Sequence, residues 1–110
     1  MKIEDWRRKI DAIDTALLQL VNLRAELAVE VGKLKKEEGL SVRNPEREQQ
    51  ILSRMKSLNP GPLPDDAVRR IFRLILDEAI RTEEFHCEMP QQGHKKKPAP
   101  RKNSRKPGRR

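Results

Sequence analysis

Arg24 occupies a position in the sequence where a charged side chain is energetically unfavourable. Apolar residues recur at alternating spacings of three and four from Ile3 to Leu34, which is typical of a long helix with one packed face. Nine of the ten positions in this stripe are apolar and the tenth is an arginine: Ile3, Trp6, Ile10, Ile13, Leu17, Leu20, Arg24, Leu27, Val31 and Leu34. A buried guanidinium needs an anion beside it. Arg24 therefore either pairs with an internal carboxylate or binds an anionic ligand.

A second cation, Lys35, is expected to share a helix face with Arg24. Eleven residues advance a helix by about three turns, so the two Cα atoms should lie roughly 16 Å apart along one side. Ala28 lies between them, with Val31 and Gly32 nearby, and these small side chains would leave a shallow floor. The spacing therefore indicates room for a small anion between two long cationic side chains.

Three further charged residues are candidates for the remaining walls of such a site. Arg47 and Glu48 lie one turn into a second predicted helix, and Glu83 continues the apolar stripe of a third. Taken one at a time, these side chains and Lys35 are more simply explained as solvated charges or ion pairs. Their combination at these spacings favours a binding site.

The elements that must position these residues are predicted to be helical. A first helix over about residues 3–38, ended by Gly39, would exceed ~50 Å at ~1.5 Å per residue. A globular monomer of this size would not cover that length, so the outer half is expected to need a partner chain. Asn44 and Pro45 are typical of a helix start, and residues 59–62 are strong breakers. Residues 64–66 open a third helix that fades near 86–89. The fold class is therefore all-α.

Composition and charge divide the 110 residues into two parts. The net charge is +8, and residues 91–110 carry nine Lys or Arg with no Asp or Glu, which leaves residues 1–90 near −1. We expect a helical domain over 1–90 and a disordered basic tail over 91–110. The single cysteine, Cys87, and the absence of a signal-like or membrane-spanning apolar run predict a cytoplasmic protein without membrane contact.

Three segments in order carry a resemblance to a known family. They are I-D-x-I-D at residues 10–14, R-x-E-L-A-x-x-V-G-x-x-K at 24–35 and N-P-x-R-E at 44–48. Together they resemble the all-helical (AroQ-type) chorismate mutases, and the resemblance covers about residues 4–87. It implies three helices, one of them very long, intertwined with a second chain into a helical-bundle homodimer with shared active sites.

The resemblance also implies roles for individual residues. Arg24 and Arg47 match cations that bind the substrate, and Lys35 matches the cation near the ether bond that breaks. Glu48 takes the position that binds the substrate hydroxyl. Arg7 matches an arginine that reaches into the active site of the partner chain.

Three positions depart from the family pattern. Asn44 stands where many members have Asp, and is expected to cap the helix and offer only backbone contact to the ligand. Ala79 stands where members often have Ser, so one hydrogen bond to a carboxylate is expected to be missing. Glu83 stands where members often have Gln, whose amide donates to the ether oxygen. A carboxylate cannot donate but a protonated acid can, so we hypothesise that Glu83 works only when protonated.

The implied reaction is the pericyclic Claisen rearrangement of chorismate to prephenate in aromatic amino acid biosynthesis. It needs no cofactor, metal or nucleophile, and the sequence has no clustered metal ligands and no nucleophile elbow. Catalysis would consist of holding a flexible dicarboxylate and stabilising the charge on the ether oxygen, with Arg24, Lys35 and Glu83 as catalytic residues.

Two other interpretations remain open from the sequence. The same scaffold supports an isochorismate-pyruvate lyase, and the residues do not separate the two enzymes. Alternatively, the chain is a non-catalytic helical module whose tail binds a polyanion through its cationic side chains. The tail has no aromatic residue on which bases would stack.

Overall fold

The computed structural model describes residues 1–88 of the chain, with side chains to His86. Three helices follow one another: α1 (Ile3–Glu37), α2 (Pro45–Leu58) and α3 (Asp65–Glu88), with no strand among these residues. The all-α prediction with one very long helix is confirmed. The predicted basic tail, residues 91–110, lies outside the described residues. None of the three helices combines the length and the apolar character needed to cross a membrane.

The helix ends follow from local chemistry. Gly39 has a φ of +74°, which favours glycine, and this lets Leu40 N–H donate to the Lys35 carbonyl at 2.8 Å and close α1. At the start of α2, the Asn44 side chain accepts a hydrogen bond from Arg47 N–H at 3.1 Å, directly before Pro45. Residues 38–44 form the loop that connects α1 to α2.

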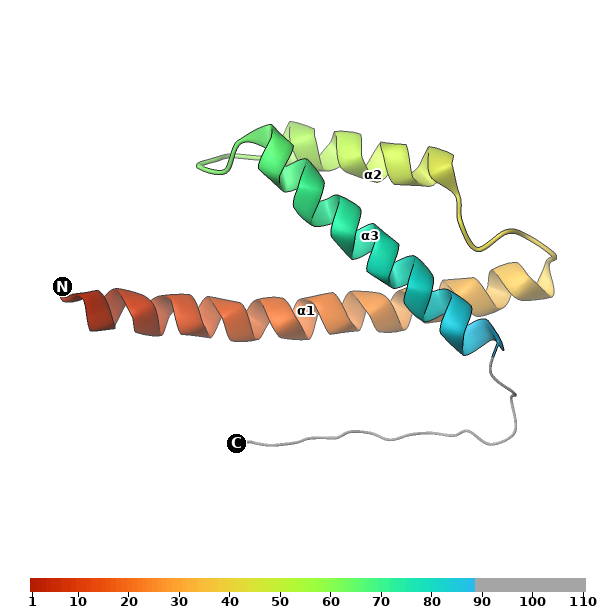
Figure 1. Ribbon diagram of the computed structural model, residues 1–110, viewed down its shortest axis with the longest axis horizontal. Coiled ribbons are helices and arrows are strands. Elements are labelled where there is room, and N and C mark those ends of the chain that lie inside the picture. Colours follow the sequence, from red (N-terminus) through yellow and green to blue (C-terminus); the bar gives the residue numbers. More distant parts are fainter. Residues whose placement is uncertain (89–110) are drawn as a thin grey trace.

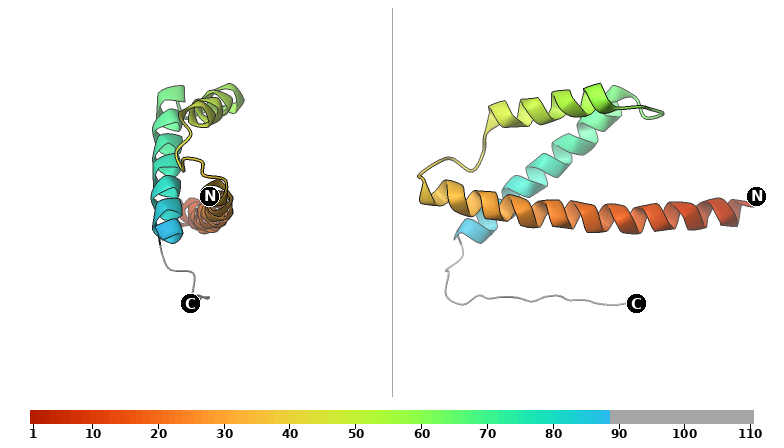
Figure 2. Two further views of the ribbon diagram at one scale, coloured as in Figure 1. Left: turned by 90° about the vertical axis from the view of Figure 1, so that its right-hand side faces the viewer. Right: turned by 180° about the vertical axis from the view of Figure 1, so that it is seen from behind.

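A small cluster of buried apolar side chains lies between α2 and α3. Ile51 and Leu52 of α2 meet Leu76 of α3, with Met55 and Phe72 packed at the edge. Figure 1 shows α2 lying along the first half of α3, while the second half of α3 crosses α1 near its C-terminal end. The right-hand view of Figure 2 shows the N-terminal part of α1 extending beyond the other two helices.

The apolar stripe of α1 is largely uncovered in a single chain. Its first six positions are each more than half exposed: Ile3, Trp6, Ile10, Ile13, Leu17 and Leu20. The radius of gyration is 17.2 Å, against about 13 Å for a compact domain of this length. An apolar face of this length is unusual for a monomer and typical of an interaction site. The core of one chain is therefore incomplete, in agreement with the sequence.

Candidate active site

A pocket of about 300 Å³ opens where α1, α2, α3 and the loop before α2 come together. Seven of the eight predicted site residues line it: Arg24, Lys35, Asn44, Arg47, Glu48, Ala79 and Glu83. The remaining wall is mainly apolar: Leu27, Ala28, Val31, Val42, Ile51, Leu76 and Ile80. The residues therefore combine an apolar cavity with a few charged groups, which is the usual composition of a small-molecule site.

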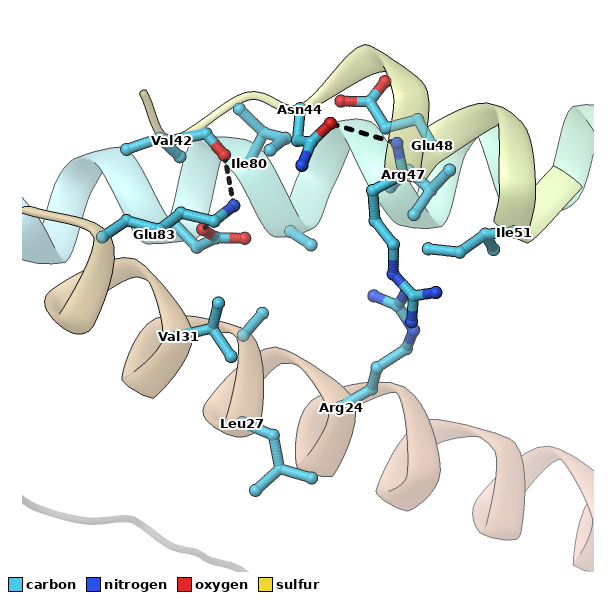
Figure 3. A pocket seen from close by; sticks show the side chains of 14 residues that line it. Arg24, Leu27, Val31, Val42, Asn44, Arg47, Glu48, Ile51, Ile80 and Glu83 are labelled. Atoms are coloured by element: carbon cyan, nitrogen blue, oxygen red, sulfur yellow. Dashed lines mark hydrogen bonds and ion pairs between the residues drawn. The ribbon is translucent and has the colours of Figure 1, made fainter. Parts of the chain in front are cut away.

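Arg24 of α1 and Arg47 of α2 point toward one another across one end of the pocket (Figure 3). Neither guanidinium makes an ion pair or a side-chain hydrogen bond with the part of the chain that the structure describes. Two facing cations repel each other unless an anion lies between them. The structural salt bridge considered for Arg24 is therefore absent among the described side chains, and the two arginines are arranged to receive a carboxylate or similar anion.

Lys35 and Glu83 form the opposite end of the pocket. The Lys35 ammonium donates a hydrogen bond to the Val42 carbonyl at 2.6 Å and lies 3.9 Å from Oε1 of Glu83. Glu83 is only 5% exposed, and its Oε1 has no hydrogen-bond partner in the described structure. A buried polar atom without a partner is rare in proteins and is expected where a ligand supplies one.

The surroundings of Glu83 determine its protonation. Burial raises the pKa of its carboxyl above the ordinary value for glutamate, and the positive charges of Lys35 and Arg24 oppose this rise. The nearby charge of Glu84 adds to it. Because the pKa is raised, the protonated acid persists to higher pH than for an exposed glutamate. A protonated Glu83 can donate a hydrogen bond into the pocket.

Glu48 is held from behind by cations that the sequence did not single out. Its carboxylate is 6% exposed and accepts a hydrogen bond from Arg73 of α3, while Arg43 Nε lies 3.6 Å from its Oε2. Oε2 itself has no hydrogen-bond partner. Arg73 and Asp77 stand at i and i+4 on α3, a weak signal in the sequence. Nothing in the sequence placed Arg43 beside them.

The three remaining predicted site residues differ in where their side chains lie. Asn44 caps α2 as predicted, so its side-chain oxygen is already engaged. Ala79 is buried in the wall of the pocket and offers no side-chain hydrogen bond. Arg7 does not line the pocket: its side chain is exposed and lies 3.6 Å from Glu4. A single chain therefore does not bring Arg7 to the site.

Gly32 sets how closely α1 approaches Glu83. A Cβ at this position would lie 3.1 Å from Oε1 of Glu83 and 3.2 Å from its Cβ. We expect Gly32→Ala to displace the Glu83 side chain by a few tenths of an ångström and lower kcat roughly tenfold. Alanine favours the helix by about 1 kcal/mol, which offsets the crowding. The free energy of unfolding measured in urea should therefore change little, while kcat falls. An unchanged kcat would show that Glu83 need not approach α1 this closely.

Comparisons with known proteins agree on one family. Residues 6–84 match the family model described as chorismate mutase type II. The chain is 30% identical over 96 residues to a chorismate mutase of Methanocaldococcus jannaschii, covering 86% of this chain and 97% of that protein. It resembles the solved structure of chorismate mutase (Form II) from Thermus thermophilus with a TM-score of 0.75 and 33% identity, over 76% of this chain and 96% of that one.

Longer relatives match over the same region. A bifunctional chorismate mutase/prephenate dehydratase of Neisseria gonorrhoeae is 44% identical over 77 residues, which is 70% of this chain and 21% of that protein. The corresponding protein of Aquifex aeolicus is 34% identical over 86 residues, 74% of this chain and 24% of its own length. The chain thus spans about a fifth to a quarter of the length of these bifunctional relatives.

Proposed function

The chain belongs to the type II chorismate mutase family, and we propose that its pocket converts chorismate to prephenate. The observation that carries the proposal is the pair of unpaired guanidinium groups, Arg24 and Arg47, set across an apolar pocket from Lys35 and Glu83. Chorismate has two carboxylates, a hydroxyl and an ether oxygen. The pocket supplies cations for the carboxylates and a cation with a potential donor for the oxygen.

The proposed chemistry needs only positioning and charge stabilisation. In the pericyclic step the ether C–O bond breaks while a C–C bond forms within the same molecule, and no proton or electron leaves it. The arginines would hold the compact conformer in which the reacting carbons meet. As the bond breaks, negative charge grows on the ether oxygen, where Lys35 and protonated Glu83 stabilise it away from bulk water. Glu48, which also lines the pocket, would accept a hydrogen bond from the substrate hydroxyl.

Identification of the product tests this proposal. Purified protein incubated with chorismate is expected to form prephenate, followed by NMR of the reaction mixture. A parallel incubation with isochorismate separates the lyase alternative, which would release salicylate and pyruvate. Salicylate without prephenate would reject the mutase and retain the lyase, and no product from either substrate would reject both.

A dependence on Glu83 protonation is expected in the pH profile. Since only the acid form donates, kcat should be highest at low pH and fall as the pH rises through the raised pKa of Glu83. Glu83→Gln donates at every pH, so its profile should be flat where the parent falls. The measurement is kcat for both proteins between about pH 5 and 8. A flat profile in the parent would reject a protonated Glu83.

We further propose that two chains pair through the uncovered stripe of α1 and share their sites. The exposed apolar side chains of the first half of α1 support this, because burying them removes a large apolar surface from water. Arg7, which lies on that half of α1 and outside its own pocket, would then complete the pocket of the partner. This arrangement would be a homodimer with two active sites, each built from residues of both chains.

Complementation between inactive variants tests the shared site. Arg7→Ala and Arg24→Ala should each be nearly inactive, but a refolded equimolar mixture should regain about a quarter of the parent activity, since each mixed dimer contains one intact site. A mixture of Arg24→Ala with Arg47→Ala is the matched control, because both changes lie in the pocket of one chain and no mixed dimer regains a site. Mixed dimers of the first pair without activity would contradict the proposal.

The cellular setting of the protein is likewise a proposal. We place it in the cytoplasm, supported by its single cysteine. Contact of residues 91–110 with polyanions is supported only by their charge, and these residues lie outside the described structure. Deleting them should abolish any binding to heparin and leave mutase activity intact.

A further inference from the structure

Four charged side chains form a closed network behind the pocket: Arg43, Glu48, Arg73 and Asp77. Oδ1 of Asp77 accepts hydrogen bonds from Nη2 of Arg43 at 3.0 Å and from Nη2 of Arg73 at 3.2 Å. Both arginines in turn face the carboxylate of Glu48. The network joins the loop before α2, the first turn of α2 and the middle of α3. Its two positive and two negative charges balance.

Glu48 is the member of the network that lines the pocket, and its position depends on the other three. A carboxylate this deeply buried is stable only when cations or donors meet it. Arg73 supplies a hydrogen bond to Oε1, and Arg43 lies just beyond hydrogen-bond distance of Oε2. Oε2 is thereby left without a hydrogen bond. Oε2 is therefore the less firmly held of the two oxygens.

Asp77, which is half-exposed, accepts a hydrogen bond from each of the two arginines. It does not line the pocket, so it makes no direct contact with a ligand there. The hydrogen bond from Arg43 and the charge of Arg73 hold the pKa of Asp77 below its ordinary value, so its carboxylate stays ionised to lower pH than that of an isolated aspartate. Without the negative charge of Asp77, the guanidinium groups of Arg43 and Arg73 would share only the carboxylate of Glu48. One negative charge would then offset the repulsion between two positive charges less completely than two do.

The same network reaches Lys35 through the loop. Arg43 directly follows Val42, whose carbonyl accepts the hydrogen bond from the Lys35 ammonium (dashed line from Val42 in Figure 3). Because Arg43 is bonded to Asp77 on α3, the neighbouring carbonyl is held over the pocket. Release of Arg43 would free the loop and with it the group that orients Lys35.

We propose that Asp77 is a positioning residue of this site, which acts through Arg43 and Arg73 on Glu48 and on the Val42 carbonyl. The inference rests on the proposed function of the pocket for its effect on rate. Its effect on the loop does not depend on that function. The two can therefore be tested separately in the same variants.

Kinetics of a double-mutant cycle test the effect on the site. Asp77→Asn should raise KM for chorismate and lower kcat/KM on the order of tenfold. If Asp77 acts through Arg43, then Arg43→Gln should have a similar effect, and the double variant should be little worse than either single one. Asp77→Glu, which keeps the charge, should recover part of the loss. Glu30→Gln is the matched control, since it removes a carboxylate from an exposed ion pair with Lys33 on α1.

Hydrogen exchange of the loop tests the effect on position. Backbone amides of residues 38–44 should exchange faster in Asp77→Asn than in the parent, with an unchanged melting temperature. Parent kinetics in Asp77→Asn, losses that simply add in the double variant, or unchanged exchange of the loop would each overturn the proposal. An inactive parent whose loop still responds to Asp77→Asn would instead contradict the proposed mutase function and leave the positioning role supported.

Discussion

Lys35→Ala is expected to lower kcat on the order of 10²- to 10³-fold. The ammonium is the nearest cation to Glu83 and is fixed by the Val42 carbonyl, so in the proposed reaction it would already be in place when charge develops on the ether oxygen. Loss of one such preorganised group typically costs about 3 to 4 kcal/mol of transition-state stabilisation. KM should change much less, because the two arginines and Glu48 remain. Steady-state kinetics with chorismate give both values.

Lys33→Ala is the control for this change. Lys33 lies on the same turn of α1 but its ammonium pairs with Glu30 at 3.2 Å on the exposed side. Its removal should leave kcat within about twofold of the parent, since exposed pairs of this kind contribute little. An equal fall in kcat for both variants would mean that α1 requires its overall charge rather than a cation at the Lys35 position.

Arg24→Ala is expected to lower kcat/KM by about 30-fold to several thousand-fold without destabilising the protein. A guanidinium that binds a carboxylate in an enclosed pocket typically contributes about 2 to 5 kcal/mol to the bound state. In the free protein the same group faces Arg47 without an ion pair in the described structure. Removing it relieves that repulsion, and alanine favours a helix. Chemical denaturation should therefore show an equal or higher free energy of unfolding.

Arg24→Lys distinguishes charge from geometry at this position. Lysine keeps the positive charge but cannot make the bidentate contact of a guanidinium with a carboxylate. We expect it to recover only part of the activity lost in Arg24→Ala. If Arg24→Ala instead unfolded the protein, Arg24 would be a structural residue, and its place in the apolar stripe would need another explanation.

The features of the fold that rest on local chemistry were accessible from the sequence. Gly39 and Asn44 mark helix ends because a positive φ and a side-chain cap depend only on neighbouring residues. The shared face of Arg24 and Lys35 follows from helix geometry alone, and both do line one pocket. Helix periodicity thus predicted much of one wall of the site before any contact between helices was known.

The features that depend on contacts between helices were not accessible in the same way. Nothing near Arg43 in the sequence indicates that it meets Asp77, which is 34 residues away. Gly32 was noted for its size, but its contact with Glu83 depends on how α3 crosses α1. The prediction that Arg7 serves a partner chain came from family resemblance and stays a prediction, because a single chain leaves it exposed.

The most direct test of the proposed function is the loss of chorismate absorbance with purified protein beside the Arg24→Ala variant. We predict chorismate consumption by the parent, and a rate lower by at least about 30-fold for a folded Arg24→Ala. That result would establish both the reaction and the role of the unpaired guanidinium in the pocket. Absence of consumption by the parent at every pH between about 5 and 8 would contradict the proposed function.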